Sequence, residues 1–306
     1  MSCLGIDTSN YTTSAALYDG TDCHNCSRLL DVKPGELGLR QSDALFAHVR
    51  RLPELFRKLL AEAPDRNITA IGVSIRPRAV EGSYMPCFLA GVSQAETLAA
   101  VLDVPLYRFS HQQGHIAASL WSAGRMELMA VPHLAWHLSG GTTELLLVEP
   151  DEKNVRASRI GGTTDIAAGQ LIDRTGKLLG LQFPSGKAVD ALSKEAETKE
   201  FYRVKCAERE FSFSGVENKV REFYDRTKSP AETAFYALHS VAWAVEKATR
   251  QAMLEYPGLP VTCAGGVASN SLLREVMAPL DAVFCPPQYS TDNAAGIAVL
   301  AWLQEH

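Results

Sequence analysis

Two histidines spaced four residues apart mark the first place where this chain could do chemistry. His111 and His115 stand in the sequence HQQGH, and side chains at positions i and i+4 of a helix project from the same face. Two imidazoles placed in this way can share one metal ion. Because an active metal site needs a third ligand and an open position, the pair equally suits two ordinary polar residues of a helix that Ser110 caps.

A carboxylate near the C-terminus could complete such a metal site. Asp292 lies in the segment Ser290-Thr291-Asp292-Asn293, which opens an expected terminal helix. Its alternative role is to cap that helix, or to be stabilised in the first turn by the helix dipole. If Asp292 instead joins the imidazoles, two histidines and one carboxylate suit iron or zinc and leave positions open for substrate oxygens.

Two glycine-bearing segments predict contacts with a phosphate or a nucleotide. The turn Ser139-Gly140-Gly141-Thr142 separates two apolar strands, and Gly265-Gly266 separates a strand from a helix that Asn270 could cap. Such turns direct several backbone N–H groups to one side, and glycine lets the backbone approach a ligand closely. A plain hairpin turn explains the first segment equally well, and Asn270 could contact the ligand instead of capping the helix.

The elements that must position these residues include one strand–turn–strand pattern that occurs twice. Residues 3–20 and 133–151 each contain an apolar strand, a short turn rich in small polar residues and a second apolar strand. Two such hairpins predict two similar lobes that clamp one nucleotide. We expect a first lobe of residues 1–130 plus 293–306 and a second lobe of residues 131–292.

Strands alternate with helices along the rest of the chain, which predicts α/β layering. A helix over 42–63 is expected to be kinked or split at Pro53. The remaining strands are expected at Cys3–Asp7, Thr13–Tyr18, Leu29–Val32, Ala70–Ile75, Pro105–Phe109, Val261–Ala264 and Ala282–Cys285. The remaining helices are expected at Phe88–Leu102, Ser110–Ser122, Ala168–Leu179, Ala188–Ala196, Ala231–Glu255, Asn270–Met277 and Asp292–Gln304.

The composition favours an enzyme with a substantial core. The chain has 306 residues, 46% of them hydrophobic, and a net charge of −5, which gives no electrostatic basis for binding nucleic acid unaided. No apolar run approaches the roughly 20 residues needed to cross a bilayer, and no secretory signal is evident. Seven scattered cysteines favour a reducing compartment, so we expect a cytoplasmic protein with no membrane contact. Cys23 and Cys26 form a C-x-x-C pair, which we interpret as two thiols near a strand edge and not as a zinc half-site or a redox motif.

Taken in order, the motifs of the chain resemble the threonylcarbamoyl transferase family, also labelled O-sialoglycoprotein endopeptidase or peptidase M22. The resemblance extends along nearly the whole chain and rests on GIDTS at Gly5–Ser9, HVRR at His48–Arg51, HQQGH at His111–His115, SGG at Ser139–Gly141, DRTGKLLGLQFPSG at Asp173–Gly186, FSFSG at Phe211–Gly215, AGGVASN at Ala264–Asn270 and TDNAA at Thr291–Ala295. It implies the actin-like ATPase fold, an α/β fold with two ribonuclease H-like lobes around a nucleotide cleft.

The resemblance also implies the roles of individual residues and the reaction. The metal ligands would be His111, His115 and Asp292, and Asp7 would be a catalytic carboxylate. The nucleotide or substrate would be bound by Ser139, Gly140, Gly141, Thr142, Asp173, Gly186 and Asn270. Family members transfer a threonylcarbamoyl group from its adenylate to N6 of adenosine 37 in ANN-decoding tRNAs, together with accessory proteins. The expected cofactors are therefore one divalent metal, iron or zinc, and an adenine nucleotide (ATP, AMP or the adenylate); the expected partners are accessory proteins of a tRNA-modification complex and tRNA, with a homodimer left open.

The chain departs from the family pattern around the expected pocket. Tyr11 and Thr12 replace an acidic pair, Gln113 replaces the glutamate of H-x-E-G-H, Thr142 replaces the histidine of SGGHT, and Ser185 replaces the first glycine of PGG. These departures remove candidate proton acceptors. A nucleotide-binding scaffold with little turnover is therefore a second hypothesis, beside a transferase acting on tRNA or on another amine or hydroxyl. Two other enzyme classes fit less well. The chain shows no clear catalytic aspartate for a sugar kinase, and its histidine pair lacks the glutamate of the HExxH motif of zinc peptidases.

Overall fold

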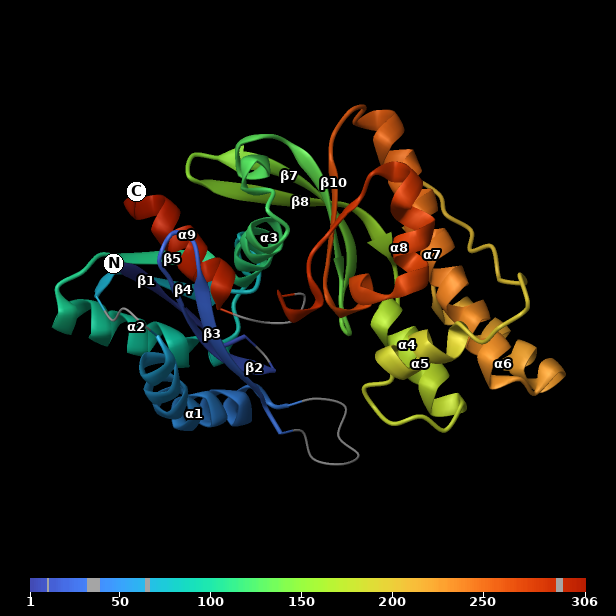
Figure 1. Cartoon of the computed structure of the whole chain (residues 1–306), viewed down its shortest axis with the longest axis horizontal. Coiled ribbons are helices and arrows are strands. Elements are labelled where there is room, and N and C mark those ends of the chain that lie inside the picture. Colours follow the sequence, from blue (N-terminus) through green and yellow to red (C-terminus); the bar gives the residue numbers. More distant parts are fainter. Residues whose placement is uncertain (10, 32–38, 64–66, 290–293) are drawn as a thin grey trace. The chain divides into compact units, whose positions relative to one another are not determined.

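Two compact units make up the chain (Figure 1). The computed structural model describes residues 1–9, 11–31, 39–63, 67–289 and 294–306. The first unit comprises Met1–Val131, Glu149–Ala157 and Asp292–His306, and the second comprises Pro132–Val148 and Ser158–Thr291. Among the described residues, no helix combines the length and the apolar character that a membrane span requires.

The sheet of the first unit has the strand order β3-β2-β1-β4-β5. β1 pairs antiparallel with β2 and parallel with β4, and β4 pairs parallel with β5. The carboxyl ends of β1, β4 and β5 therefore lie along one edge of the sheet. The strands are β1 (Ser2–Asp7), β2 (Thr12–Tyr18), β3 (Cys23–Leu29), β4 (Ile68–Arg76) and β5 (Leu106–Ser110).

Helices cover both faces of the first sheet (Figure 1). Apolar side chains of α1 and α2 pack with Leu4, Ile6 and Val73 on one face. On the other face α9 packs against β1, β4 and α3. Its approach to β1 is close, because a Cβ on Gly5 would lie 2.5 Å from the carbonyl oxygen of Ala294. The α-helices of this unit are α1 (Gln41–Glu62), α2 (Leu89–Leu102), α3 (His111–Ser122) and α9 (Ala295–Glu305).

The second sheet repeats the connectivity of the first. Its strand order is β11-β10-β6-β7-β8-β9. The hairpin of β6 and β7 corresponds to that of β1 and β2, and β10 pairs parallel with β6 as β4 does with β1. The prediction of two similar lobes is confirmed by this repeat. The strands are β6 (His133–Leu138), β7 (Thr143–Asp151), β8 (Asn154–Thr163), β9 (Glu210–Phe211), β10 (Val261–Ala264) and β11 (Val283–Phe284).

The core of the second unit forms between its sheet and a long buried helix, α7. Trp136, Leu138 and Leu145 from the hairpin join Val241 and Val245 of that helix in one apolar cluster. Trp136 also donates from its indole N–H to Thr249 Oγ1 at 2.8 Å, so the polar atom of the buried ring is satisfied. The α-helices are α4 (Ala168–Leu178), α5 (Gly186–Ser193), α6 (Ser214–Thr227), α7 (Pro230–Glu255) and α8 (Ser271–Met277).

The structure corrects several expected elements. The strand expected at Leu29–Val32 is instead β3, whose polar sequence CHNCSRL is held at the sheet edge by its ladder with β2. α1 runs through Pro53 as one helix, so the helix is not split there, and the alternative of a kink stays a prediction. The polar elements β8 and α6 were not expected, because their sequences carry no continuous apolar run. Cys23 and Cys26 both lie on β3, and burial raises the pKa of Cys23 to about 12, which disfavours the thiolate that redox chemistry requires.

Candidate functional site

The helix that carries both histidines begins at the carboxyl edge of the first sheet. β5 ends at Ser110, whose Oγ accepts a hydrogen bond from the backbone N–H of Gln113 at 3.2 Å. Gln113 Oε1 in turn accepts from the backbone N–H of Ser110 at 2.8 Å. These reciprocal bonds form a capping box, so the predicted cap at Ser110 is confirmed and the start of α3 is fixed.

A close crossing of two helices fixes α3 from its other side. A Cβ added to Gly296 of α9 would lie 1.8 Å from the carbonyl oxygen of Gly114. A Cβ on Gly114 would lie 2.8 Å from Cδ1 of Ile297. Packing therefore requires glycine at position 296, where a Cβ would meet backbone atoms, whereas a Cβ on Gly114 would meet the end of one flexible side chain. The crossing holds the turn that separates the two histidines.

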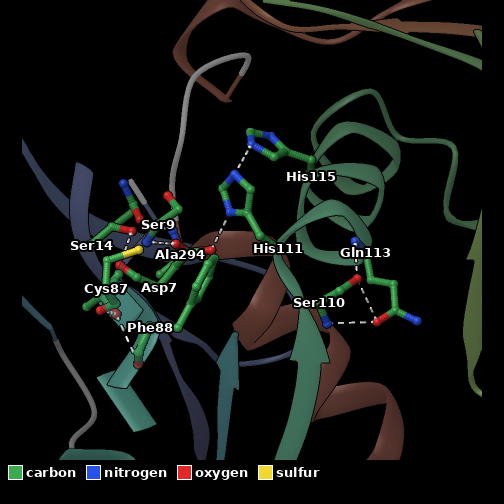
Figure 2. A network of polar contacts seen from close by, with 12 residues as sticks. Asp7, Ser9, Ser14, Cys87, Phe88, Ser110, His111, Gln113, His115 and Ala294 are labelled. Atoms are coloured by element: carbon green, nitrogen blue, oxygen red, sulfur yellow. Dashed lines mark hydrogen bonds and ion pairs between the residues drawn. The ribbon is translucent and has the colours of Figure 1, made fainter. Parts of the chain in front are cut away.

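The two imidazoles and one buried carboxylate form a continuous chain of contacts (Figure 2). The Nε2 atoms of His111 and His115 lie 2.9 Å apart, as the i and i+4 spacing predicts. Asp7, at the end of β1, places Oδ2 2.7 Å from Nδ1 of His111, and its other oxygen accepts from the backbone N–H of Ser9 at 2.8 Å. Asp7 is only 1% exposed, so water does not compete strongly for its carboxylate.

The carboxylate determines which nitrogen of His111 can bind a metal. An ionised Asp7 only accepts hydrogen bonds, and a neutral His111 that donates to it from Nδ1 keeps a lone pair on Nε2. Histidines that bind metals commonly donate from their other nitrogen to a carboxylate in this way. The donor set of His111 and His115 therefore fits a divalent metal. Among the described residues no group of three or more His, Cys, Asp or Glu side chains is arranged to hold a metal; Asp292 lies outside the described residues.

Gln113, which stands where the family pattern has a glutamate, contacts neither imidazole through its side chain. Its side chain lies beside Ser110 and away from the imidazoles (Figure 2), because positions i and i+2 of a helix face different directions. The other acidic groups missing from the family pattern belong to the turn between β1 and β2 and to the first residue of β2. There Thr12 is buried and Tyr11 is 37% exposed.

Most of the predicted nucleotide residues of the second unit follow the carboxyl ends of β6 and β10, whereas Asp173 lies in α4 and Gly186 opens α5. Ser139 donates from its backbone N–H to the carbonyl oxygen of Thr142 at 2.8 Å, which closes a two-residue turn over Gly140 and Gly141. Ser139 Oγ also accepts from the backbone N–H of Thr142 at 3.1 Å. The first residue after β10, Gly265, has φ +97° and packs against the carbonyl group of Leu138. The two glycine segments are therefore neighbours.

Glycines of the second unit fall into two groups according to the space around them. A Cβ on Gly169 of α4 would lie 2.5 Å from Cα of Gly140, and one on Gly265 would lie 2.2 Å from the carbonyl oxygen of Leu138. Packing therefore requires glycine at these two positions. A Cβ on Gly140, Gly141, Gly186 or Gly266 would meet no protein atom within 4 Å. At those four positions packing does not explain glycine, and the backbone stays accessible.

Asp173 and Asn270 are occupied by hydrogen bonds within the protein. Asp173 Oδ1 accepts from the backbone N–H of Ser185 at 2.8 Å, which fixes the start of α5. Asn270 caps α8 by accepting from the backbone N–H of Leu273 at 2.9 Å, so the predicted cap is confirmed. Its Nδ2 donates to Oδ1 of Asp190 at 2.8 Å.

Sequence reasoning missed two supporting residues. Gln113 belongs to a Ser-x-x-Gln pattern, which is a recognised capping-box signature and could have identified its contact with Ser110. Asp190 accepts from Asn270 and Ser271 across a sequence separation of about 80 residues. No local pattern signals that contact.

Comparison with known proteins identifies relatives along the whole chain. A family model described as tRNA N6-adenosine threonylcarbamoyltransferase matches residues 36–299. The protein of that name from Thermus thermophilus is 34% identical to this chain over 98% of this chain and 91% of its own length. The one from Thermosipho africanus is 31% identical over 98% of this chain and 93% of its own length.

Solved structures with a similar fold have little sequence identity to this chain. The activator of 2-hydroxyisocaproyl-CoA dehydratase from Clostridium difficile, with bound ADPNP, has a TM-score of 0.56 and 14% identity over 100% of this chain and 95% of its own. A ROK family glucokinase from Streptomyces griseus, in complex with glucose and AMPPNP, has a TM-score of 0.55 and 10% identity over 99% of both chains. The predicted α/β fold of actin-like ATPases and sugar kinases is confirmed by these likenesses.

Proposed function

Because the chain belongs to the tRNA N6-adenosine threonylcarbamoyltransferase family, we propose that it transfers a carbamoyl-type group from an adenylate to an amine. The acceptor that family membership favours is N6 of adenosine in tRNA. The amine nitrogen attacks the carbamoyl carbon, a C–N bond forms and the bond from that carbon to the phosphate oxygen breaks. AMP leaves with the bonding electron pair, and the amine loses one proton.

The second unit would bind the nucleotide. Open space surrounds three of its glycines, because a Cβ on Gly140, Gly141 or Gly266 would meet no protein atom within 4 Å. A phosphate can therefore approach their backbone N–H groups. Such fixed donors offset negative charge on the phosphate as the bond to AMP breaks. The loop that Asp173 holds through Ser185 would border the ribose or the threonyl group, with Thr142 and Asn270 as further contacts.

The first unit would hold the metal. His111 and His115, with Asp292 as third ligand, would bind one divalent ion, iron or zinc. When bound, that ion supplies Lewis-acid polarisation of the substrate oxygens. Asp7 would act by fixing the proton of His111 on Nδ1. Its contact with His111 at 2.7 Å is the observation that carries this proposal, because it supports the imidazole as a ligand.

We also propose that accessory proteins present the tRNA. The net charge of −5 gives the chain no general attraction for nucleic acid. A chain of this family would therefore rely on partners for tRNA affinity, and its own units would supply the nucleotide and metal sites.

A second candidate function is a nucleotide-binding partner protein with little turnover. Tyr11 and Thr12 supply no carboxylate in the first turn. A base that deprotonates the attacking amine would then have to come from elsewhere. This candidate keeps nucleotide binding and abandons transfer.

Release of AMP from threonylcarbamoyl-adenylate, measured with and without tRNA, tests the proposal. We expect tRNA-dependent release by the native chain and its loss in a His111→Ala, His115→Ala double variant. His24→Ala, which changes a histidine of β3 in the same unit, is the matched control and should keep the native rate. Absence of AMP under every condition would favour the partner protein, and release that ignores tRNA would point to a different acceptor.

A further inference from the structure

We infer that Gln113 is a positioning residue that fastens the first turn of α3, and with it the two imidazoles, to strand β8. The inference rests on the proposed function only in treating His111 and His115 as metal ligands. It concerns a side chain that touches neither imidazole. The evidence for the inference is that the oxygen and the nitrogen of this buried side-chain amide each bond to a different element of the protein.

Every polar atom of the Gln113 side chain is engaged within the protein. Oε1 accepts from the backbone N–H of Ser110 at 2.8 Å and from its Oγ at 3.0 Å. Nε2 donates to the carbonyl oxygen of Val155 on β8 at 2.8 Å. Gln113 is 8% exposed, and both Ser110 and Val155 are buried. The amide therefore joins the start of α3 to a strand about 40 residues away in sequence.

The contact with Val155 explains why this position carries an amide. Glutamate and glutamine serve equally as the third residue of a capping box, because both offer an acceptor to the backbone. A carboxylate would nevertheless direct its second oxygen at the Val155 carbonyl oxygen, leaving two acceptors in buried contact with no proton between them. The donor at Nε2 therefore distinguishes glutamine from the glutamate that the family pattern has here.

The far end of this link is itself held in place. Val155 lies in the segment Glu149–Ala157, which clusters with the first unit. Two residues before Val155, Lys153 exchanges reciprocal hydrogen bonds with Gln304 of α9, each at 3.2 Å. The Val155 carbonyl is thus a fixed anchor. α3 is then braced on one side by β8 and on the other by its glycine crossing with α9.

The imidazoles depend on that brace because of where they lie. His111 is the first residue of α3, and the first turn of a helix lacks the backbone bonds that secure its interior. Besides the Gln113 and Ser110 pair, the bond from the Gln112 backbone N–H to the Pro77 carbonyl oxygen at 3.0 Å also holds this turn. A small shift of His111 would separate its Nε2 from that of His115. Metal affinity should therefore respond to Gln113.

Two variants distinguish the contribution of the amide oxygen of Gln113 from that of its nitrogen, and a third variant is a matched control. Gln113→Glu keeps the acceptor for Ser110 and removes the donor to Val155, whereas Gln113→Met removes both at similar volume. Gln251→Glu removes the same kind of donor from a backbone carbonyl, that of Cys206 in the second unit. The full-length variants are titrated with Co²⁺ at one fixed pH, and the visible spectrum of the bound ion and its affinity are recorded.

We expect Gln113→Met to weaken Co²⁺ binding about tenfold or more and to alter the spectrum. Gln113→Glu should show a smaller change in the same direction, and Gln251→Glu should match the native chain. Native affinity and an unchanged spectrum in Gln113→Met would overturn the inference, even if that variant unfolds more easily, because Gln113 would then only support the fold.

Hydrogen exchange gives a readout that needs no metal. Gln113→Met should accelerate exchange of the amides in the first turn of α3 and leave those of α8 unchanged. If the native chain binds no Co²⁺, the metal part of the proposed function fails; the positioning role is then decided here. Unchanged exchange in that turn would overturn the positioning role regardless of the metal result.

Discussion

The two regions to which we assign chemistry use different parts of the protein, side chains in the first unit and backbone in the second. In the first unit, Asp7, His111 and His115 act through side chains, joined by contacts of 2.7 and 2.9 Å. In the second unit, the edge formed by β6 and β10 presents glycine backbone, and the polar side chains of Asp173 and Asn270 in that unit bond to their own protein. The first region offers ionisable groups, and the second offers fixed backbone dipoles.

This difference indicates how each region should fail. A side-chain site is lost when a functional group is removed, with limited effect on the fold. A backbone site is lost when a methyl group is added where a ligand must approach. The regions are not wholly opposed, because the imidazoles also rely on the glycine crossing of α3 and α9.

The largest effect should come from Gly296→Ala, which tests that shared reliance on glycine. A Cβ there would meet the Gly114 carbonyl oxygen at 1.8 Å and the Ala118 nitrogen at 2.7 Å. We expect the free energy of unfolding to fall by about 3 kcal/mol, together with metal affinity. Urea unfolding measures the first and Co²⁺ titration the second. Gly215→Ala, which meets no atom within 4 Å, is the control; equal stability of the two variants would refute the tight crossing.

The first unit should also be the pH-sensitive one. Burial lowers the pKa of His48 from 6.5 to about 4, against the opposing effect of Asp7. Between these values the unfolded chain binds more protons than the folded one, so stability falls as the pH is lowered. We expect this histidine to contribute a loss of about 2 kcal/mol between pH 7 and pH 5. In urea unfolding, His48→Leu should show a shallower slope, and an identical slope would count against the buried neutral imidazole.

Asp7→Asn sharpens the contrast by changing one functional group. The amide keeps an acceptor but loses the charge that holds the Nδ1 proton of His111. We expect metal affinity to fall about ten- to hundredfold, whereas nucleotide affinity in the second unit stays native. Chelator competition and calorimetry with AMP give the two affinities. A parallel fall in both would mean that the change disrupts the fold, and no fall in either would remove Asp7 from the metal site.

The smallest change in stability should come from Gly141→Ala. Its Cβ would meet no protein atom within 4 Å, so the unfolding midpoint should stay native. AMP affinity should nevertheless fall about tenfold if a phosphate contacts this turn. Gly169→Ala is the companion variant, because its Cβ would lie 2.5 Å from Cα of Gly140 and should lower stability and affinity together. Native AMP affinity in Gly141→Ala would exclude phosphate contact at this turn.

Local patterns predicted the parts of these regions that are local. The spacing of His111 and His115 placed them on one face of α3, and the turn at Ser139 followed from glycine between apolar strands. The contact of Asp7 with His111 spans 104 residues and depends on the parallel placement of β1, β4 and β5, which no window of sequence contains. Polar β3 and α6 were misjudged or missed for a related reason, since tertiary pairing and packing outweigh weak local apolar patterns.

Metal content of the purified chain tests the central claim most directly. Elemental analysis should find about one divalent ion per native chain and almost none in the His111→Ala, His115→Ala double variant, with AMP affinity unchanged between them. Equal, near-zero metal in both proteins after purification and reloading with iron or zinc would contradict the account, because the imidazoles that Asp7 orients would then hold no ion.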